Sequence, residues 1–190
     1  MERTNFDLVI VGVGGQGTLL ASKIIGALAM GEGLGVKVSE VHGMSQRGGS
    51  VITHVRVGED VYAPLVSEGQ ADFLLAFEAL EAARAAAFLG VDGLAVVSSQ
   101  RIFPMPVITG ESAYPEDPVL LLEGHRVEVV NALEKAVDAG SSRAVNLVLL
   151  GALSKHLPFM EQAWTEAITA SVPPNTLPVN ERAFYYGRVG

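Results

Sequence analysis

The chain has 190 residues, a formal net charge of −8 and no cysteine. With 49% hydrophobic and 18% charged residues, its composition excludes an intrinsically disordered protein. The acidic charge excludes a typical nucleic-acid-binding protein, which needs a basic face. The absence of cysteine excludes disulfides, a thiol nucleophile and a cysteine-ligated iron–sulfur cluster within the chain. The length predicts a single domain over residues 1–190.

The apolar runs are short or are interrupted by glycine and charge, so we expect no transmembrane helix and no membrane partner. Residues 1–5 lead directly into a predicted strand and lack the pattern of a signal peptide. The expected compartment is therefore the cytoplasm.

Residues 5–40 predict a βαβ unit, which consists of a strand, a glycine-rich turn, a helix and a second strand. The strands are expected at 6–11 and 36–38, and the helix at 16–30. Between them stands the pattern Gly-x-Gly-Gly-x-Gly, in which the first glycine permits the turn and the last permits close packing of the helix. Free N–H groups at the start of such a helix can hold a phosphate. The candidate cofactor-binding residues are Gly12, Gly14, Gly15, Gln16 and Gly17.

Glu40 follows Gly17 by 23 positions, close to the spacing of the acid that holds the ribose in nicotinamide dinucleotide sites. The next segment, 41–50, is a polar glycine-rich loop where a typical dinucleotide-binding fold continues into a helix. Residues 50–57 then alternate as in a strand, and the turn at 58–60 predicts 61–64 as its hairpin partner.

The remaining chain predicts an α/β arrangement with an irregular, proline-rich segment at 100–123. Glu78 and Glu81 are expected on the solvated face of a helix, and Asn180 is expected to cap a short last helix. The four histidines show no metal-ligand spacing, so no metal site is expected. The further predicted strands are 72–77, 93–98 and 126–130, and the further helices are 78–89, 132–139, 143–157, 160–171 and 180–185.

The segments 42–50, 53–56 and 72–84 resemble the gamma domain of the 2-oxoacid:ferredoxin oxidoreductases, most closely the small beta subunits of the indolepyruvate enzymes. The glycine pattern, the predicted helix from residue 146 and the closing segment 180–184 also fit that family. The expected fold is therefore α/β and Rossmann-like. It has a mostly parallel sheet, a β-hairpin excursion and a helical C-terminal third.

The resemblance implies a subunit that supports oxidative decarboxylation of indolepyruvate, or another arylpyruvate, to an acyl-CoA. Thiamine diphosphate, magnesium and iron–sulfur clusters are expected in a larger partner subunit, which passes electrons to ferredoxin. Coenzyme A is the implied co-substrate, and this chain is expected to hold no cofactor alone. No catalytic residue is assigned. The residues expected at the partner interface or active-site loop are His42, Ser45, Gln46, Arg47, Gly48, Gly49 and Ser50.

Two alternatives stay open from the sequence. One is a free-standing NAD- or FAD-dependent oxidoreductase that uses the glycine turn and Glu40. The other is an assembly module without chemistry, for example a homodimer.

Overall fold

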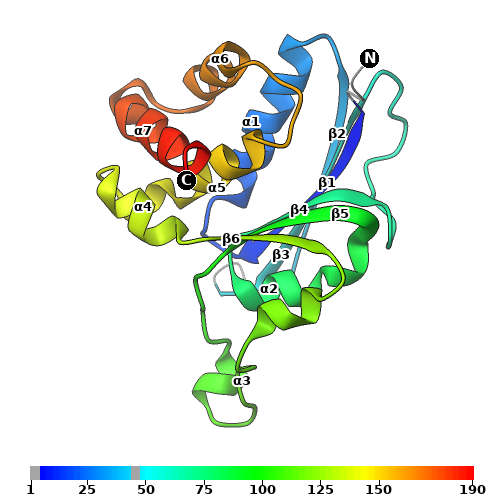
Figure 1. Ribbon diagram of the computed structural model, residues 1–190, viewed down its shortest axis with the longest axis vertical. Helices are drawn as coiled ribbons and strands as arrows, with labels where there is room; N and C mark the ends of the chain where they lie inside the picture. The colour runs from blue at the N-terminus through cyan, green and yellow to red at the C-terminus, as the bar shows by residue number, and fades with distance from the viewer. Residues whose placement is uncertain (1–4, 44–47) are drawn as a thin grey trace.

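The computed structural model describes residues 5–43 and 48–190. Within them the chain forms a six-stranded sheet of order β2-β3-β1-β4-β5-β6 (Figure 1). The strand β3 is antiparallel to its neighbours β1 and β2, whereas the pairs β1–β4, β4–β5 and β5–β6 are parallel. The strands are β1 (Phe6–Val13), β2 (Gly35–His42), β3 (Ser50–Gly58), β4 (Ala71–Ala76), β5 (Leu89–Ser98) and β6 (Arg126–Val130).

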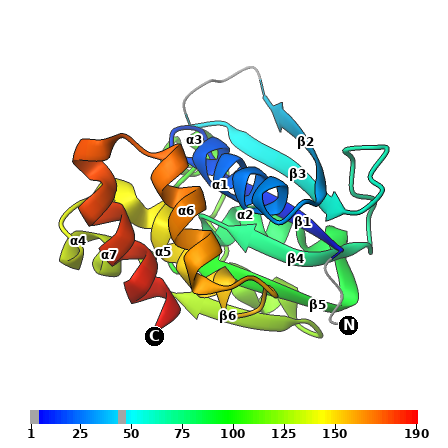
Figure 2. The same ribbon diagram turned by 90° about the horizontal axis from the view of Figure 1, so that it is seen from above.

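Helices cover both faces of the sheet but unequally. In Figures 1 and 2, α1 and α4 to α7 form a thick layer on one face, and the short helix α2 lies on the other. The α-helices are α1 (Thr18–Gly31), α2 (Ala79–Arg84), α3 (Met105–Ile108), α4 (Ala132–Asp138), α5 (Val145–Ser154), α6 (Glu161–Ser171) and α7 (Leu177–Arg188). The 3₁₀ turns are η1 (Ala86–Phe88), η2 (Pro118–Leu122), η3 (Ser142–Ala144) and η4 (Pro174–Thr176).

The central strand β1 is buried on both faces, which explains its continuous apolar sequence. Leu8 and Ile10 point into the larger core beneath the thick helical layer. Val9 and Val11 point into the smaller core beneath α2 and η2. The α/β fold with a mostly parallel sheet is thus confirmed, and so is the helical C-terminal third.

The prediction that segment 61–64 pairs with strand 50–57 in a hairpin is wrong. Residues 61–64 form no strand, and β3 instead pairs with β2 from Val51 to Gly58. Because β3 then also pairs with β1, it lies between the two strands of the βαβ unit. The alternation of apolar and polar residues was enough to predict β3 as a strand. Which strand it pairs with depends on how the whole sheet buries its apolar side chains, and the local sequence does not contain that information.

The C-terminal helices also differ from expectation in extent. The predicted helix at 180–185 is α7, which begins at Leu177, so Asn180 lies inside it and donates to the carbonyl of Thr176 at 3.0 Å. Asn180 is therefore not a cap. The helix α5 is buried along its whole length. Among the helices of the described ranges, none combines the length and apolar character that a membrane span requires.

Candidate functional site

The glycine-rich turn follows β1 at the edge of the sheet where β1 and β4 both end. This is the switch point of the sheet: from β1 the chain continues through α1 to β2 on one side, and from β4 it continues to β5 on the opposite side. In open α/β sheets this point is the usual place for a ligand. Gly15 and Gly17 have positive φ angles of 101° and 90°, so the turn requires glycine at both.

Side chains of the protein itself fill the inner side of this turn. The Oε1 atom of Gln16 accepts from the N–H of Val13 at 2.7 Å, and its Nε2 donates to the carbonyl of Phe77 at 3.1 Å. A Cβ atom on Gly12 would lie 2.9 Å from both Gln16 and Phe77. The N–H of Gly14 donates to Gly49 at 2.9 Å. The inner side therefore has no room for a pyrophosphate.

The outer side of the turn is open. A Cβ atom on Gly15 would meet nothing within 4 Å, whereas one on Gly17 would lie 2.9 Å from the amide of Asn146. Beside Gly15 and Gly17 lies a hollow of about 330 Å³, also lined by Gln100 and Arg143. Any anion that reaches the start of α1 must approach from this side.

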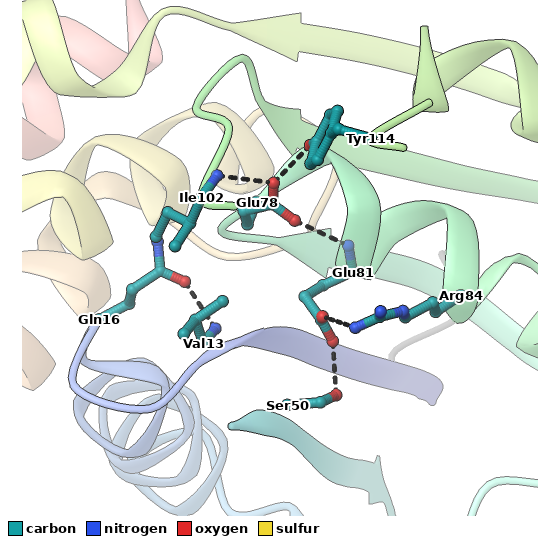
Figure 3. Close-up of polar contacts among 8 residues, drawn as sticks. All are labelled: Val13, Gln16, Ser50, Glu78, Glu81, Arg84, Ile102 and Tyr114. Carbon is teal, nitrogen blue, oxygen red and sulfur yellow. Dashed lines mark hydrogen bonds and ion pairs between the residues drawn. The ribbon is translucent and has the colours of Figure 1, made fainter. Parts of the chain in front are cut away.

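Two buried carboxylates, Glu78 and Glu81, lie next to the turn at the start of α2 (Figure 3). The two residues are 1% and 4% exposed, so the prediction of a solvated helix face is wrong. The reason is that α2 packs against η2 and the face of the sheet formed by β1, β4 and β5, and its first turn faces inward. Buried carboxylates need several hydrogen-bond donors to offset the lost hydration, and both have them.

Glu78 connects α2 with the irregular segment at 100–123. Its Oε2 accepts from the N–H of Glu81 at 2.9 Å and so caps the helix. Its Oε1 accepts from the N–H of Ile102 at 3.0 Å and from the hydroxyl of Tyr114 at 2.6 Å. Burial and the Glu78 carboxylate raise the pKa of Tyr114, which keeps the phenol protonated as a donor. Neither contact was foreseen from the sequence, because nothing local marks a bond across so many residues.

Glu81 connects α2 with the first residue of β3, where the preceding loop ends. Its Oε2 accepts from the hydroxyl of Ser50 at 2.5 Å, and its Oε1 accepts from Arg84 at 2.6 Å. Since Gly49 also contacts the glycine turn, this edge brings together the two regions that the sequence singled out. His42 is exposed at the end of β2, and Gly48 has a φ of 76°. Ser45, Gln46 and Arg47 lie outside the described residues.

Glu40 does not lie where a dinucleotide site needs it. It is on β2, where its carboxylate accepts from the hydroxyl of Thr53 at 3.3 Å. Since β3 separates β2 from β1, Glu40 is displaced from the glycine turn by one additional strand spacing of about 4.8 Å. This geometry counts against the NAD alternative. Across the described ranges, no group of three or more potential ligands could hold a metal ion.

Comparison with known proteins agrees with the geometry of the fold. The Indolepyruvate oxidoreductase subunit IorB of Thermococcus kodakarensis is 43% identical over 189 residues, covering 96% of this chain and 94% of that protein. The gamma subunit of a keto/oxoacid ferredoxin oxidoreductase from Geobacter sulfurreducens superposes with a TM-score of 0.73 at 25% identity, covering 96% of each chain.

A third match shows the same fold within a longer chain. The 2-oxoglutarate:ferredoxin oxidoreductase of Magnetococcus marinus superposes with a TM-score of 0.76 at 21% identity, covering 98% of this chain but 31% of that one. The sequence profile of the family Pyruvate ferredoxin/flavodoxin oxidoreductase matches residues 7–189. The chain therefore belongs to the pyruvate ferredoxin/flavodoxin oxidoreductase family.

Proposed function

We propose that this chain is the small subunit of an indolepyruvate:ferredoxin oxidoreductase, folded as one gamma-type domain. The observation that carries the proposal is the 43% identity to an indolepyruvate oxidoreductase subunit along nearly the whole of both chains. The reaction assigned to the complete enzyme is oxidative decarboxylation of indolepyruvate to an acyl-CoA, with the electrons passed to ferredoxin.

The chemistry of this reaction is assigned to a larger partner subunit. Thiamine diphosphate with magnesium supplies the carbanion chemistry, and iron–sulfur clusters supply electron transfer. A chain without cysteine has no thiolate for a cluster, which supports placing the clusters in the partner. Ferredoxin is then reduced through that partner. The proposed compartment is the cytoplasm, where coenzyme A and ferredoxin are available.

The glycine turn has a narrower role in this proposal than the sequence predicted. Because Gln16 and Phe77 fill its inner side, a cofactor contact is confined to Gly15 and the adjoining hollow. The negative charge of a coenzyme A phosphate matches the positive charge of Arg143, which lines this hollow. In the assembled enzyme, Arg143→Ala is expected to raise the KM for coenzyme A several-fold and leave the KM for indolepyruvate unchanged. Equal effects on both constants would contradict this assignment.

The loop before β3 is the proposed contact with the partner near its active site. Its described part, from His42 to Gly43 and from Gly48 to Ser50, is held at the sheet edge by Gly14 and Glu81. These contacts fix Gly49 and Ser50 at the place where the partner is proposed to bind, which lowers the entropy that these two residues lose on binding.

The test is purification of the tagged chain together with the larger subunit of the same organism. We expect a brown complex that reduces ferredoxin with indolepyruvate and coenzyme A, while the isolated chain is colourless and inactive. A chain that binds no larger subunit and releases NAD or flavin on denaturation would instead support the free-standing oxidoreductase.

A further inference from the structure

The segment between β5 and η2, residues 101–117, projects from the rest of the fold and is called the α3 arm here. Figure 1 shows α3 set apart from both the sheet and the thick helical layer. Phe103, Met105 and Ile108 are 55%, 66% and 64% exposed. At the base of the arm, Leu120 and Leu121 are 67% and 63% exposed. So many large apolar side chains exposed within 103–121 are typical of a surface that another protein covers.

The arm is held in one position by a buried group. Glu78 accepts from Ile102 before α3 and from Tyr114 after it, so one carboxylate fixes both ends of the excursion (Figure 3). The rings of Phe103 and Tyr114 lie 5.1 Å apart, and the Arg101 guanidinium lies 5.8 Å from the Tyr114 ring. Fixing the arm in advance lowers the entropy lost on binding.

The arm and the loop before β3 are positioned by the same short helix. Glu78 holds the arm, and Glu81, one turn later on α2, holds Ser50. The two surface segments are therefore parts of one edge of the molecule. A partner that contacts the loop, as in the proposed function, can contact the arm at the same time.

A second copy of this chain does not suit the arm. A hollow of about 590 Å³ is lined by charged groups that include Asp7, Arg56, Asp72 and Arg126, so a second copy would offer the arm a mainly polar site there. In a symmetric dimer whose two arms meet at the axis, their acidic groups would repel each other. The exposed acids of the arm are Glu111, Glu116 and Asp117.

We propose that the α3 arm inserts into an apolar cleft with a basic rim on the larger subunit, and that Glu78 is the positioning residue that presents it. This inference rests on the proposed function, which supplies the larger subunit. The apolar side chains of the arm match such a cleft, and its acids match the rim.

The test measures the affinity of the chain for the larger subunit with Met105→Glu, matched by Met160→Glu as a control. Both methionines are exposed, at 66% and 79%, but Met160 precedes α6 in the helical layer. We expect Met105→Glu to raise the Kd at least tenfold and Met160→Glu to change it less than twofold. Equal effects of the two variants, with wild-type binding intact, would overturn the role of the arm alone.

Tyr114→Phe tests the positioning by Glu78 without changing the exposed apolar residues. It removes one donor, and Glu78 keeps its contact with Ile102. We expect a several-fold rise in Kd together with faster proteolytic cleavage within 101–117. Unchanged affinity and unchanged cleavage would overturn the positioning role.

The remaining outcomes separate this inference from the function on which it rests. Failure of the wild-type chain to bind the larger subunit would overturn the proposed function itself. An isolated chain that sediments as a dimer, and that Met105→Glu converts to a monomer without affecting capture of the larger subunit, would assign the arm to self-association and overturn the inference.

Discussion

At the residue scale, two glycines set the distance between α5 and α7. A Cβ atom on Gly187 would lie 1.9 Å from the carbonyl oxygen of Val148, and one on Gly151 would lie 2.0 Å from that of Phe184. Both distances are far below van der Waals contact with a backbone atom, so the helices would have to separate. Gly187→Ala is therefore expected to lower the free energy of unfolding by about 3 kcal/mol or more, measured by urea denaturation.

The control for this prediction is Gly26→Ala in α1. Nothing lies within 4 Å of a Cβ atom at Gly26, so alanine there should raise stability by about 0.5–1 kcal/mol through its better helix propensity. A loss of stability at Gly26 as large as that at Gly187 would show that helical glycines matter here for another reason.

A second prediction at this scale concerns His54 on β3. Its ring is buried against Phe88, and its Nδ1 accepts from the N–H of Val66 at 3.4 Å. Burial lowers the pKa of His54 from its usual 6.5, so the unfolded chain binds the proton more readily than the folded one. Stability is therefore present above pH 6.5 and decreases as the pH falls below it, with a slope of at most about 1.4 kcal/mol per pH unit.

His54→Asn is the variant that isolates this slope, because its side-chain oxygen can accept from Val66 and does not titrate. We expect urea denaturation between pH 7 and pH 5 to show a shallower decrease for the variant than for the wild type. Parallel curves would place the titration elsewhere in the molecule.

The sequence could predict the position of the glycine turn but not its conformation or its occupants. The pattern assigned the turn to the first glycine, Gly12, whereas the positive φ angles occur at Gly15 and Gly17. The burial of Glu78 and Glu81 was missed because it depends on the fold and not on a local pattern. Two acids three positions apart fit a solvated helix, and only the fold brings Tyr114 and Ser50 to them.

At the scale of elements, the existence of the strands was easier to predict than the order in which they pair in the sheet. The run 50–57 identifies β3 by its alternation, and β3 spans Ser50–Gly58. Its insertion between β1 and β2 depends on long-range pairing that no local pattern contains. The helix predicted at 78–89 likewise ends at Arg84, because the chain must enter β5 at Leu89.

One contact between elements is directly testable. Arg182 on α7 donates twice to the carbonyl of Ala139, the C-terminal cap of α4, at 3.1 and 2.9 Å. A cation at a helix C-terminus also interacts favourably with its dipole. Arg182→Ala is expected to cost about 1 kcal/mol of unfolding free energy, measured in urea. Arg143→Ala, at an exposed arginine, should change it by less than about 0.5 kcal/mol, and equal losses would contradict the capping role.

At the scale of the whole molecule, the formal charge of −8 bears on where ferredoxin docks. Ferredoxins are usually acidic, so this chain repels them at low ionic strength, and electrons are expected to leave through the partner subunit. The chain offers three exposed acids on α6 and α7 for a test: Glu161, Glu166 and Glu181. Changing all three to glutamine moves the formal net charge from −8 to −5.

If ferredoxin docks on the partner beyond the screening length, which is about 10 Å at 0.1 M salt, these charges do not reach it. The KM of the assembled enzyme for ferredoxin should then change less than twofold between the wild type and the triple variant at low salt. A KM that falls several-fold in the variant, with the difference lost at high salt, would mean that ferredoxin approaches this chain. Electron exit would then have to be placed next to the helical layer of α6 and α7.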